Sequence, residues 1–277
     1  MTSLNNPDPG ISGRISPEQS PLVFGNPVGA LRLRPSGDRF LTELGWLHSR
    51  HSFSFGHHHD PHWERFGPLR VINDDIIQPA SGFGLHPHRD MEIVTVMVEG
   101  RLEHRDSLGN GACLEAGEVQ RMTAGTGITH SEMNAAAKPC RLLQIWIEPR
   151  RSGLAPSYSQ KRIEPANTWT TLIAPEAGGI GTGGCLSESP QEALTVAQDV
   201  TIWRAQPGRG EVLALPLRQG CRGWLQLISG AVMLQTTGTG GPEALALQHG
   251  DGIGFAAARL PSVQATKDSD LLLLQLP

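Results

Sequence analysis

The sequence is poor in cysteine, in aromatic residues and in long apolar runs. Its four cysteines stand far apart and form no Cys-X-X-Cys pair, which argues against a zinc ribbon or a redox dithiol. No apolar stretch approaches the roughly 20 residues that a membrane-spanning helix needs, and long helical periodicity is missing as well. These absences predict a chain that neither spans a membrane nor folds as a helical bundle.

Concentrated basic charge is missing too. The formal net charge is -4, only three of the 23 basic residues are lysines, and no block of like charges is long enough for a nucleic-acid footprint. Residues 1–21 are rich in Asn, Pro, Ser and Gly and lack the apolar segment of a signal peptide. We therefore expect no direct nucleic-acid binding, a flexible tail over residues 1–21 and a cytoplasmic location.

Turn-forming residues, in contrast, are abundant. With 33 glycines and 21 prolines, the chain is divided into many short apolar runs, which is typical of an all-β protein. The length of 277 residues suits two ordinary domains. We predict an N-terminal metal-binding β-domain over residues 22–150, followed by a linker and a second β-domain over residues 151–277.

The two predicted domains repeat one order of strands and turns. The apolar run at residues 94–98 ends shortly before Gly100, and the run at residues 225–228 ends shortly before Gly230. Both glycines are predicted to form hairpin turns. The sequence therefore predicts two copies of one β-barrel. The second copy has His249 as its only histidine, so we expect no second metal site of the same kind.

Two short segments of the first half carry pairs of metal-binding side chains. His86 and His88 flank Pro87, and His130 and Glu132 flank Ser131. Because side chains alternate between the two faces of a strand, each pair projects to one side of its strand. A barrel can bring both pairs into one cavity. Three imidazoles and one carboxylate suit a single divalent Fe, Ni, Cu, Mn or Zn ion and leave positions for substrate or dioxygen.

The carboxylate ligand has an alternative. Glu92 lies four residues after His88, across a possible bend, whereas Glu132 lies two residues after His130 and shares its face. On strand spacing alone, both glutamates remain candidates for the ligand.

A separate histidine tract is a weaker candidate for the metal site. His57, His58, His59 and His62 follow a predicted strand, and His-rich tracts can bind metal. Three consecutive histidines cannot share one face of a strand, however, and the sequence Asp60-Pro61 indicates a turn. We predict that this tract is a surface loop near the mouth of the cavity.

Longer stretches of the first half resemble the pirin family of cupin proteins. The resemblance rests on Gly-Pro-Leu-Arg-Val-Ile-Asn-Asp-Asp at residues 67–75, Gly-Phe-Gly-Leu-His-Pro-His-Arg-Asp-Met-Glu at 82–92, His-Arg-Asp-Ser-Leu-Gly-Asn at 104–110 and Gly-Thr-Gly-Ile-Thr-His-Ser-Glu-Met-Asn at 125–134. The general cupin pattern has a glycine where Ala80 stands here. The resemblance is specific over roughly the first half and looser in the second.

The resemblance implies a bicupin, in which two cupin barrels follow each other in one chain. It implies that the first barrel binds one metal ion, usually iron as Fe(II), through His86, His88, His130 and Glu132. The second barrel of the family lacks a metal. Glu92 then becomes a residue that orients a ligand histidine.

Two functions follow from the resemblance as expectations. Bacterial relatives are associated with quercetin 2,3-dioxygenase activity, in which a flavonol, a small aromatic substrate, reacts with O2. Glu132 would then be the catalytic base that takes the proton of the flavonol hydroxyl. The alternative is a non-enzymatic metal- or redox-sensing protein that binds a transcription factor or a metabolic enzyme, as eukaryotic relatives are thought to do.

Overall fold

The computed structural model describes residues 31–176, 193–238, 241–256 and 262–277, and the predicted tail over residues 1–21 lies outside this part of the chain. Nearly all regular structure in it is β-strand. The exceptions are two short 3-10 helices, η1 (Ser36–Asp38) and η2 (Pro61–Trp63). None of the described helices is long and apolar enough to cross a membrane. The prediction of an all-β protein is confirmed.

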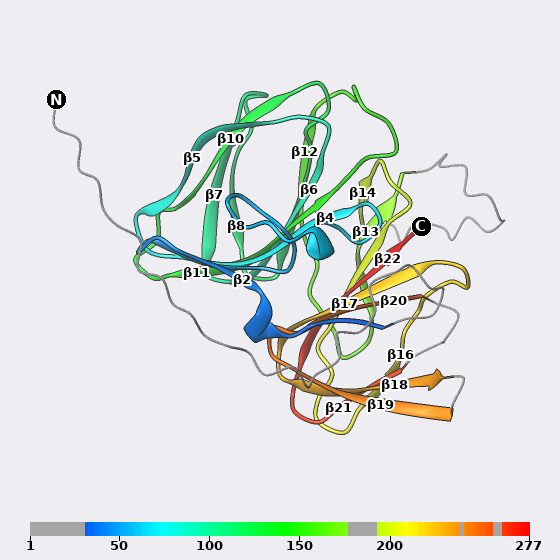
Figure 1. Ribbon diagram of the computed structural model, residues 1–277. Coiled ribbons are helices and arrows are strands. Elements are labelled where there is room, and N and C mark those ends of the chain that lie inside the picture. The colour runs from blue at the N-terminus through cyan, green and yellow to red at the C-terminus, as the bar shows by residue number, and fades with distance from the viewer. Residues whose placement is uncertain (1–30, 177–192, 239–240, 257–261) are drawn as a thin grey trace, which may run out of the picture.

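The first barrel consists of two facing sheets, drawn in the upper part of Figure 1. Its strands are β2 (Phe40–Glu43), β3 (Leu47–His51), β4 (Leu69–Ile77), β5 (Ser81–His88), β6 (Glu92–Glu99), β7 (Arg101–Asp106), β8 (Gly111–Glu115), β9 (Glu118–Thr123), β10 (Ile128–Asn134), β11 (Cys140–Ile147) and β12 (Ser157–Arg162). The larger sheet has the order β12-β9-β6-β11-β4-β3-β2, and the smaller has the order β5-β10-β7-β8.

The second barrel repeats this arrangement. Its strands are β1 (Arg32–Arg34), β13 (Thr170–Pro175), β14 (Leu194–Val196), β15 (Thr201–Ala205), β16 (Val212–Ala214), β17 (Arg222–Ser229), β18 (Ala231–Gly238), β19 (Gly241–Gln248), β20 (Gly252–Ala256), β21 (Ser262–Ala265) and β22 (Asp270–Leu276). The larger sheet has the order β1-β20-β17-β22-β15-β13-β14, and the smaller has the order β16-β21-β18-β19. The predicted pair of cupin barrels is confirmed.

Strand pairing crosses the boundary predicted at residue 150. Strand β1 precedes the first barrel in the sequence, yet it pairs with β20 of the second. Strand β12 follows residue 150, yet it pairs with β9 and extends the larger sheet of the first barrel. The division into domains of residues 22–150 and 151–277 stays a prediction. In the structure, each half of the sequence supplies one edge strand to the barrel formed mainly by the other half.

The predicted hairpin turns at Gly100 and Gly230 are wrong. Both glycines have positive φ, +74° and +86°, as tight turns require. However, β6 and β7 belong to different sheets, as do β17 and β18. Each glycine therefore forms a corner at which the chain passes from one sheet of its barrel to the other. A β-carbon at Gly100 would lie 2.8 Å from Cβ of Cys140, so the corner is closely packed as well.

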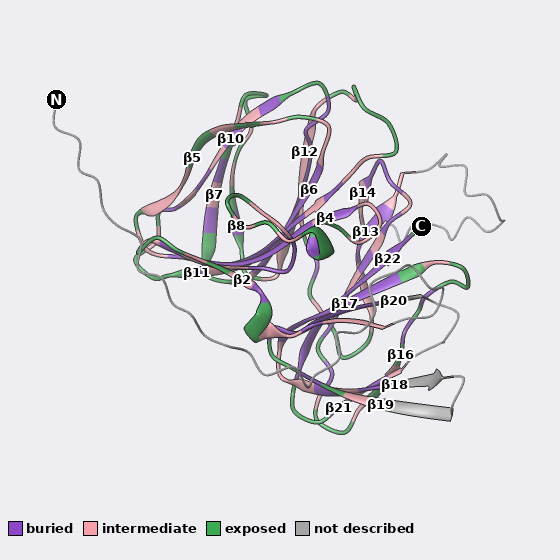
Figure 2. Cartoon of the chain, in the orientation of Figure 1, coloured by how far each residue is buried: buried purple, intermediate pink, exposed green. Residues whose placement is uncertain are grey.

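The main hydrophobic core lies between the two barrels. Val94 and Val96 of β6 contribute to it from the first barrel, and Leu272 and Leu274 of β22 contribute from the second. Strands of both larger sheets are coloured as buried where the barrels meet in Figure 2. Because side chains alternate, Thr95 between the two valines points the other way, into the first barrel. The face of this larger sheet that points into the first barrel is therefore available to form a site.

Candidate metal centre

Three strands of the smaller sheet carry polar side chains into the first barrel. In the antiparallel pairing of β5 with β10, His86 lies directly opposite His130. In the pairing of β10 with β7, Glu132 lies directly opposite His104. Directly opposed residues of paired strands project to the same face. The strand register therefore gathers these four side chains on one side of the sheet, with His88 two residues beyond His86.

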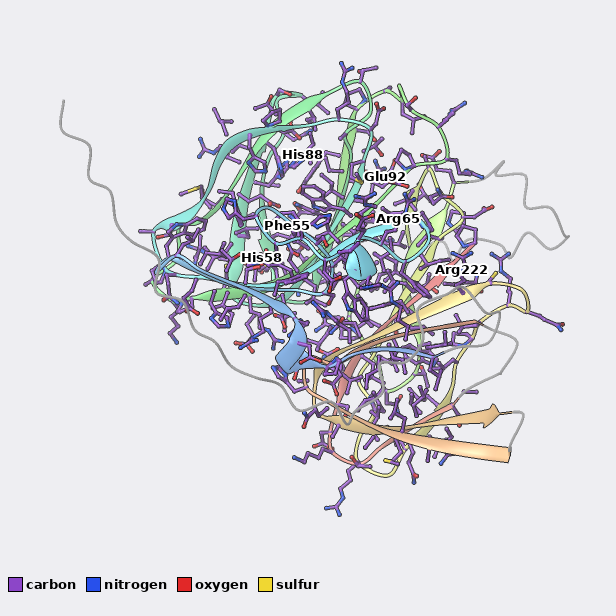
Figure 3. The ribbon with its side chains drawn as sticks, in the orientation of Figure 1. Phe55, His58, Arg65, His88, Glu92 and Arg222 are labelled. Carbon is purple, nitrogen blue, oxygen red and sulfur yellow. The ribbon has the colours of Figure 1, made fainter. Side chains whose placement is uncertain are left out.

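Three of the histidines form a close cluster. The ring centroids are 4.4 Å apart for His86 and His130, 4.8 Å for His86 and His88, and 4.9 Å for His88 and His130. Each offers one ring nitrogen that lies within 4.8 Å of the others. Figure 3 shows the labelled side chain of His88 within the first barrel. The structure thus brings together the three histidines that the sequence indicated.

His130 is fully buried, and neither of its ring nitrogens has a hydrogen-bond partner among the described residues. Buried polar atoms in folded proteins nearly always have partners. Burial, with His86 and His88 nearby, lowers the pKa of His130 to about 3, and burial lowers the pKa of His88 to about 4. Both imidazoles are therefore neutral at neutral pH, which is the form that binds a metal ion. The residues present fit a metal.

Glu132 belongs to an overlapping group. Its carboxylate lies within 4.8 Å of ring nitrogens of His104 and His130, but it is not grouped with His86 and His88. Gln120 Nε2 donates a hydrogen bond to Oε1 at 2.8 Å, and Gln144 Nε2 donates to Oε2 at 2.9 Å. Burial raises the pKa of Glu132 to about 7 against these hydrogen bonds. The set of His86, His88, His130 and Glu132 as four ligands of one ion stays a prediction.

The two glutamines are held in turn by the larger sheet. Thr95 Oγ1 donates to Gln144 Oε1 at 2.7 Å and accepts from Gln120 Nε2 at 2.9 Å. Tyr158 Oη lies 2.8 Å from Gln160 Oε1 and 3.2 Å from Gln120 Oε1, so its single proton is shared between the two amide oxygens. These residues come from β6, β9, β11 and β12, so the larger sheet orients a carboxylate that the smaller sheet supplies. Sequence reasoning did not single them out.

His104 is a potential ligand that sequence reasoning also missed. It is buried, its ring stacks on Tyr158 with centroids 4.4 Å apart, and Nε2 lies 3.2 Å from Oδ2 of Asp106. Its Nδ1 has no hydrogen-bond partner among the described residues. A signal was present in the sequence His104-Arg105-Asp106, whose alternation places the imidazole and the carboxylate on one face.

Glu92 does not face the site, so its expected role in orienting a ligand histidine is wrong. It lies on the same face of β6 as Val94 and Val96, which pack between the barrels. Its buried Oε2 accepts a hydrogen bond from Thr123 at 2.8 Å. Burial raises the pKa of Glu92 to about 7, although Thr123 and Arg121 oppose the shift.

The separate histidine tract contributes no residue to either ligand group of the described chain. Instead, His58 stacks on Phe40 with ring centroids 5.3 Å apart and lies 3.2 Å from the hydroxyl of Thr42. Phe55, which lies two residues before this tract, is connected to the histidine cluster through the ring of Trp146. Phe55 meets Trp146 edge-on at 5.5 Å, and Trp146 meets His88 at 4.9 Å.

The second barrel has apolar side chains at the equivalent place. In the pairing of β16 with β21, Leu213 lies opposite Val263, where the first barrel has His86 opposite His130. Val263 is buried in the interior core of the second barrel, and Leu213 packs against this core. Both potential ligand groups found among the described residues lie in the first barrel.

Comparison with known proteins places this geometry in a family. The sequence profile described as Pirin matches residues 34–147, and the profile of the quercetinase C-terminal cupin domain matches residues 186–276. The quercetin 2,3-dioxygenase of Escherichia coli K12 is 37% identical over 246 residues, which cover 88% of this chain and 98% of that relative.

Solved structures agree with the sequence comparison. The crystal structure of YhhW from Escherichia coli is 36% identical, has a TM-score of 0.78 and covers 90% of this chain and 98% of its own. A structure of the same bacterial pirin in complex with nickel(II) has the same TM-score and identity, and covers 90% of this chain and 99% of its own. Because this identity extends over nearly the whole of both chains, the protein belongs to the pirin family.

Proposed function

We propose that the protein is a metal-dependent dioxygenase of the pirin type that opens the ring of a flavonol with O2. The observation that carries the proposal is His130, whose two buried ring nitrogens lack partners and which lies beside His86 and His88. The name of the Escherichia coli relative, quercetin 2,3-dioxygenase, supports the substrate class. Fe(II) is the proposed metal, and the same donors suit Ni, Cu, Mn or Zn.

His86, His88, His130 and Glu132 would hold the ion. When bound, the metal would supply a Lewis acid for the flavonol oxygen and the redox chemistry that O2 requires. An imidazole ligand adds no charge, so the single carboxylate would compensate only one of the two charges of a divalent ion. The site would therefore remain suited to an anionic substrate oxygen.

Glu132 is the base in this proposal. Both of its oxygens accept hydrogen bonds from glutamine amides, which leaves lone pairs on each oxygen for the hydroxyl proton of the substrate. Because Gln120 and Gln144 fix the carboxylate on both sides, its direction does not depend on substrate binding. Trp146 packs edge-on against His88, and its buried Nε1–H has no partner among the described residues, so it can donate to a substrate oxygen.

Oxygen consumption tests the proposal. Full-length protein is loaded with Fe(II) without air, its iron content is measured, and oxygen uptake is followed after quercetin is added. We expect turnover in the wild type and none in His88→Ala. The matched control is His59→Ala, which removes an exposed histidine of the separate tract and should retain turnover. An absence of oxygen uptake with any flavonol at full iron occupancy would contradict the enzyme and favour the regulatory alternative.

A further inference from the structure

A cavity lies where the two barrels meet, on the opposite side of the larger sheet of the first barrel from the metal centre. Its volume is about 520 Å³, which is within the usual range for small-molecule sites. Asp74 of β4 and Arg141 of β11 line it. The residue next to Arg141, Leu142, packs inside the first barrel instead. The alternation of side chains thus gives these strands two functional faces.

Basic side chains from separate segments converge on this inter-barrel cavity. They come from the residue before β2, from β3, from β11 and from the turn between β19 and β20, and they are Arg39, His48, Arg50, Arg141 and His249. Among the described residues, the acidic members of the lining are Asp74 and Glu99. Three arginines therefore face two carboxylates in a chain whose overall formal charge is -4. The lining of the cavity therefore carries more positive than negative charge, whereas the chain as a whole has a negative net charge.

Asp74 is already engaged by Arg141. Arg141 Nε donates to Oδ1 at 2.8 Å, and Nη2 donates to Oδ2 at 3.0 Å, so the pair is bidentate. Arg39 reaches the same carboxylate only with Nη2, at 3.5 Å. One carboxylate thus serves two guanidinium groups.

Arg39 remains incompletely partnered. Its side chain is 2% exposed, and its Nε and Nη1 have no hydrogen-bond partner among the described residues. Buried guanidinium groups without partners are unfavourable. Burial lowers the pKa of Arg39, Asp74 opposes this shift, and Arg50 lowers the pKa further through charge repulsion. Asp74, which is shared with Arg141, is the carboxylate that offsets the charge of Arg39 among the described residues.

Arg50 is a partly exposed arginine of the lining. It lies on the outer face of β3. Its guanidinium forms no ion pair or hydrogen bond with a residue that the structure describes. Arg50 therefore has unused donors that can reach a ligand in the cavity, whereas the unpartnered Nε and Nη1 of Arg39 are buried, so Arg39 contributes its positive charge.

We propose that the inter-barrel cavity is a binding site for a small metabolite that carries an oxyanion, either a phosphate or a carboxylate, bound by the guanidinium of Arg50 close to the buried charge of Arg39. The planar guanidinium fork matches both groups through two parallel hydrogen bonds. A bound oxyanion would balance the excess positive charge that the arginines create. His249, which is exposed, would contribute a further donor, whereas Nδ1 of His48 is already engaged by the carboxylate of Glu43. The site is separate from the metal centre.

Isothermal titration of the full-length, metal-loaded protein in low-salt buffer tests this site, with glycerol 3-phosphate and succinate as probes, which chelate metal ions only weakly. We expect the wild type to bind at least one probe and Arg50→Gln to bind it at least about tenfold more weakly, because a charged donor is lost. Arg50 is chosen because it is partly exposed and carries no structural contact, so the variant should fold. Arg209→Gln, which removes an exposed arginine outside the cavity, is the matched control and should bind like the wild type.

The outcomes separate this site from the proposed activity. Binding of glycerol 3-phosphate alone would assign a phosphate ligand, and binding of succinate alone would assign a carboxylate. Binding should persist in His88→Ala, whether or not that variant turns over a flavonol. The absence of a binding heat with both probes up to about 10 mM, or equal affinity in Arg50→Gln and the wild type, would overturn the proposal.

Discussion

At the scale of the residue, Glu132 and Glu92 show that burial alone does not identify a functional acid. Burial raises the pKa of each to about 7. What separates them is the face of the strand. Glu132 shares a face with His130 and is fixed by two amides, whereas Glu92 faces the core between the barrels. A raised pKa therefore points to function only when the strand register places the group in a site.

The pH dependence of stability provides a test of the position of Glu92. Its pKa is raised from 4.5 to about 7 on folding, so the folded state binds its proton more tightly than the unfolded state does. The resulting stability is fully present below pH 4.5 and is lost as the pH rises through 7. The lost contribution is up to about 3 kcal/mol. Glu92→Gln, which is neutral at all pH values, should not lose it.

Urea unfolding of the wild type and Glu92→Gln across this pH range measures the effect. The stability of the variant relative to the wild type should increase between pH 4.5 and 7. Comparing the two proteins removes the contributions of the buried histidines, which are common to both. A difference that does not change with pH would show that Glu92 titrates in the folded protein as it does in the unfolded chain.

At the scale of the element, the placement of β10 depends on the turn before it. Gly125 in this turn has φ of +48°, and a β-carbon there would lie 2.0 Å from the carbonyl oxygen of Leu154. The same carbonyl accepts a hydrogen bond from the backbone N–H of Thr126 at 2.9 Å. The chain must therefore approach closely here before β10 carries His130 and Glu132 into the barrel.

Gly125→Ala should therefore reduce both stability and metal binding. The positive φ alone costs about 1 kcal/mol for alanine, and the contact with Leu154 adds to this because backbone atoms must shift. Thermal unfolding and iron content of the purified variant measure the two effects. Gly111→Ala is the control, because a β-carbon there meets nothing within 4 Å. Unchanged iron content in Gly125→Ala would mean that the turn does not position β10.

The local sequence pattern predicts where strands and turns occur better than it predicts which strands pair with each other. The two-residue spacing of His86 and His88 predicted a shared face, and the structure has it, because alternation is a property of a single strand. His104 was missed because its place beside Glu132 depends on how β7 pairs with β10. The sequence at Gly100 predicts a hairpin turn, and this is wrong because a turn signal does not indicate to which sheet the next strand belongs. Cross-strand register is the information that local pattern lacks.

At the scale of the whole molecule, the two barrels are joined by exchanged strands and a shared core. Strand β1 crosses to the second barrel, and the larger sheets pack against each other. Trp224 of β17 lies at the centre of the aromatic contacts in this core. Its ring centroid lies 4.9 Å from that of Phe53 and 6.5 Å from that of Trp63, both in the first half of the chain. This arrangement favours one cooperative unit over two independent domains.

Trp224→Ala tests that cooperativity. The side chain is fully buried, so its truncation should lower the free energy of unfolding by about 3–5 kcal/mol. Hydrogen exchange read by mass spectrometry resolves the two barrels. If they unfold together, peptides of β10 should lose as much protection as peptides of β17, although β10 does not belong to either of the sheets that meet. Val212→Ala, at an exposed position of the second barrel, should leave the protection of the β10 and β17 peptides unchanged. Loss confined to the second barrel would instead make it an independent unit, and the metal centre would then not depend on the core between the barrels.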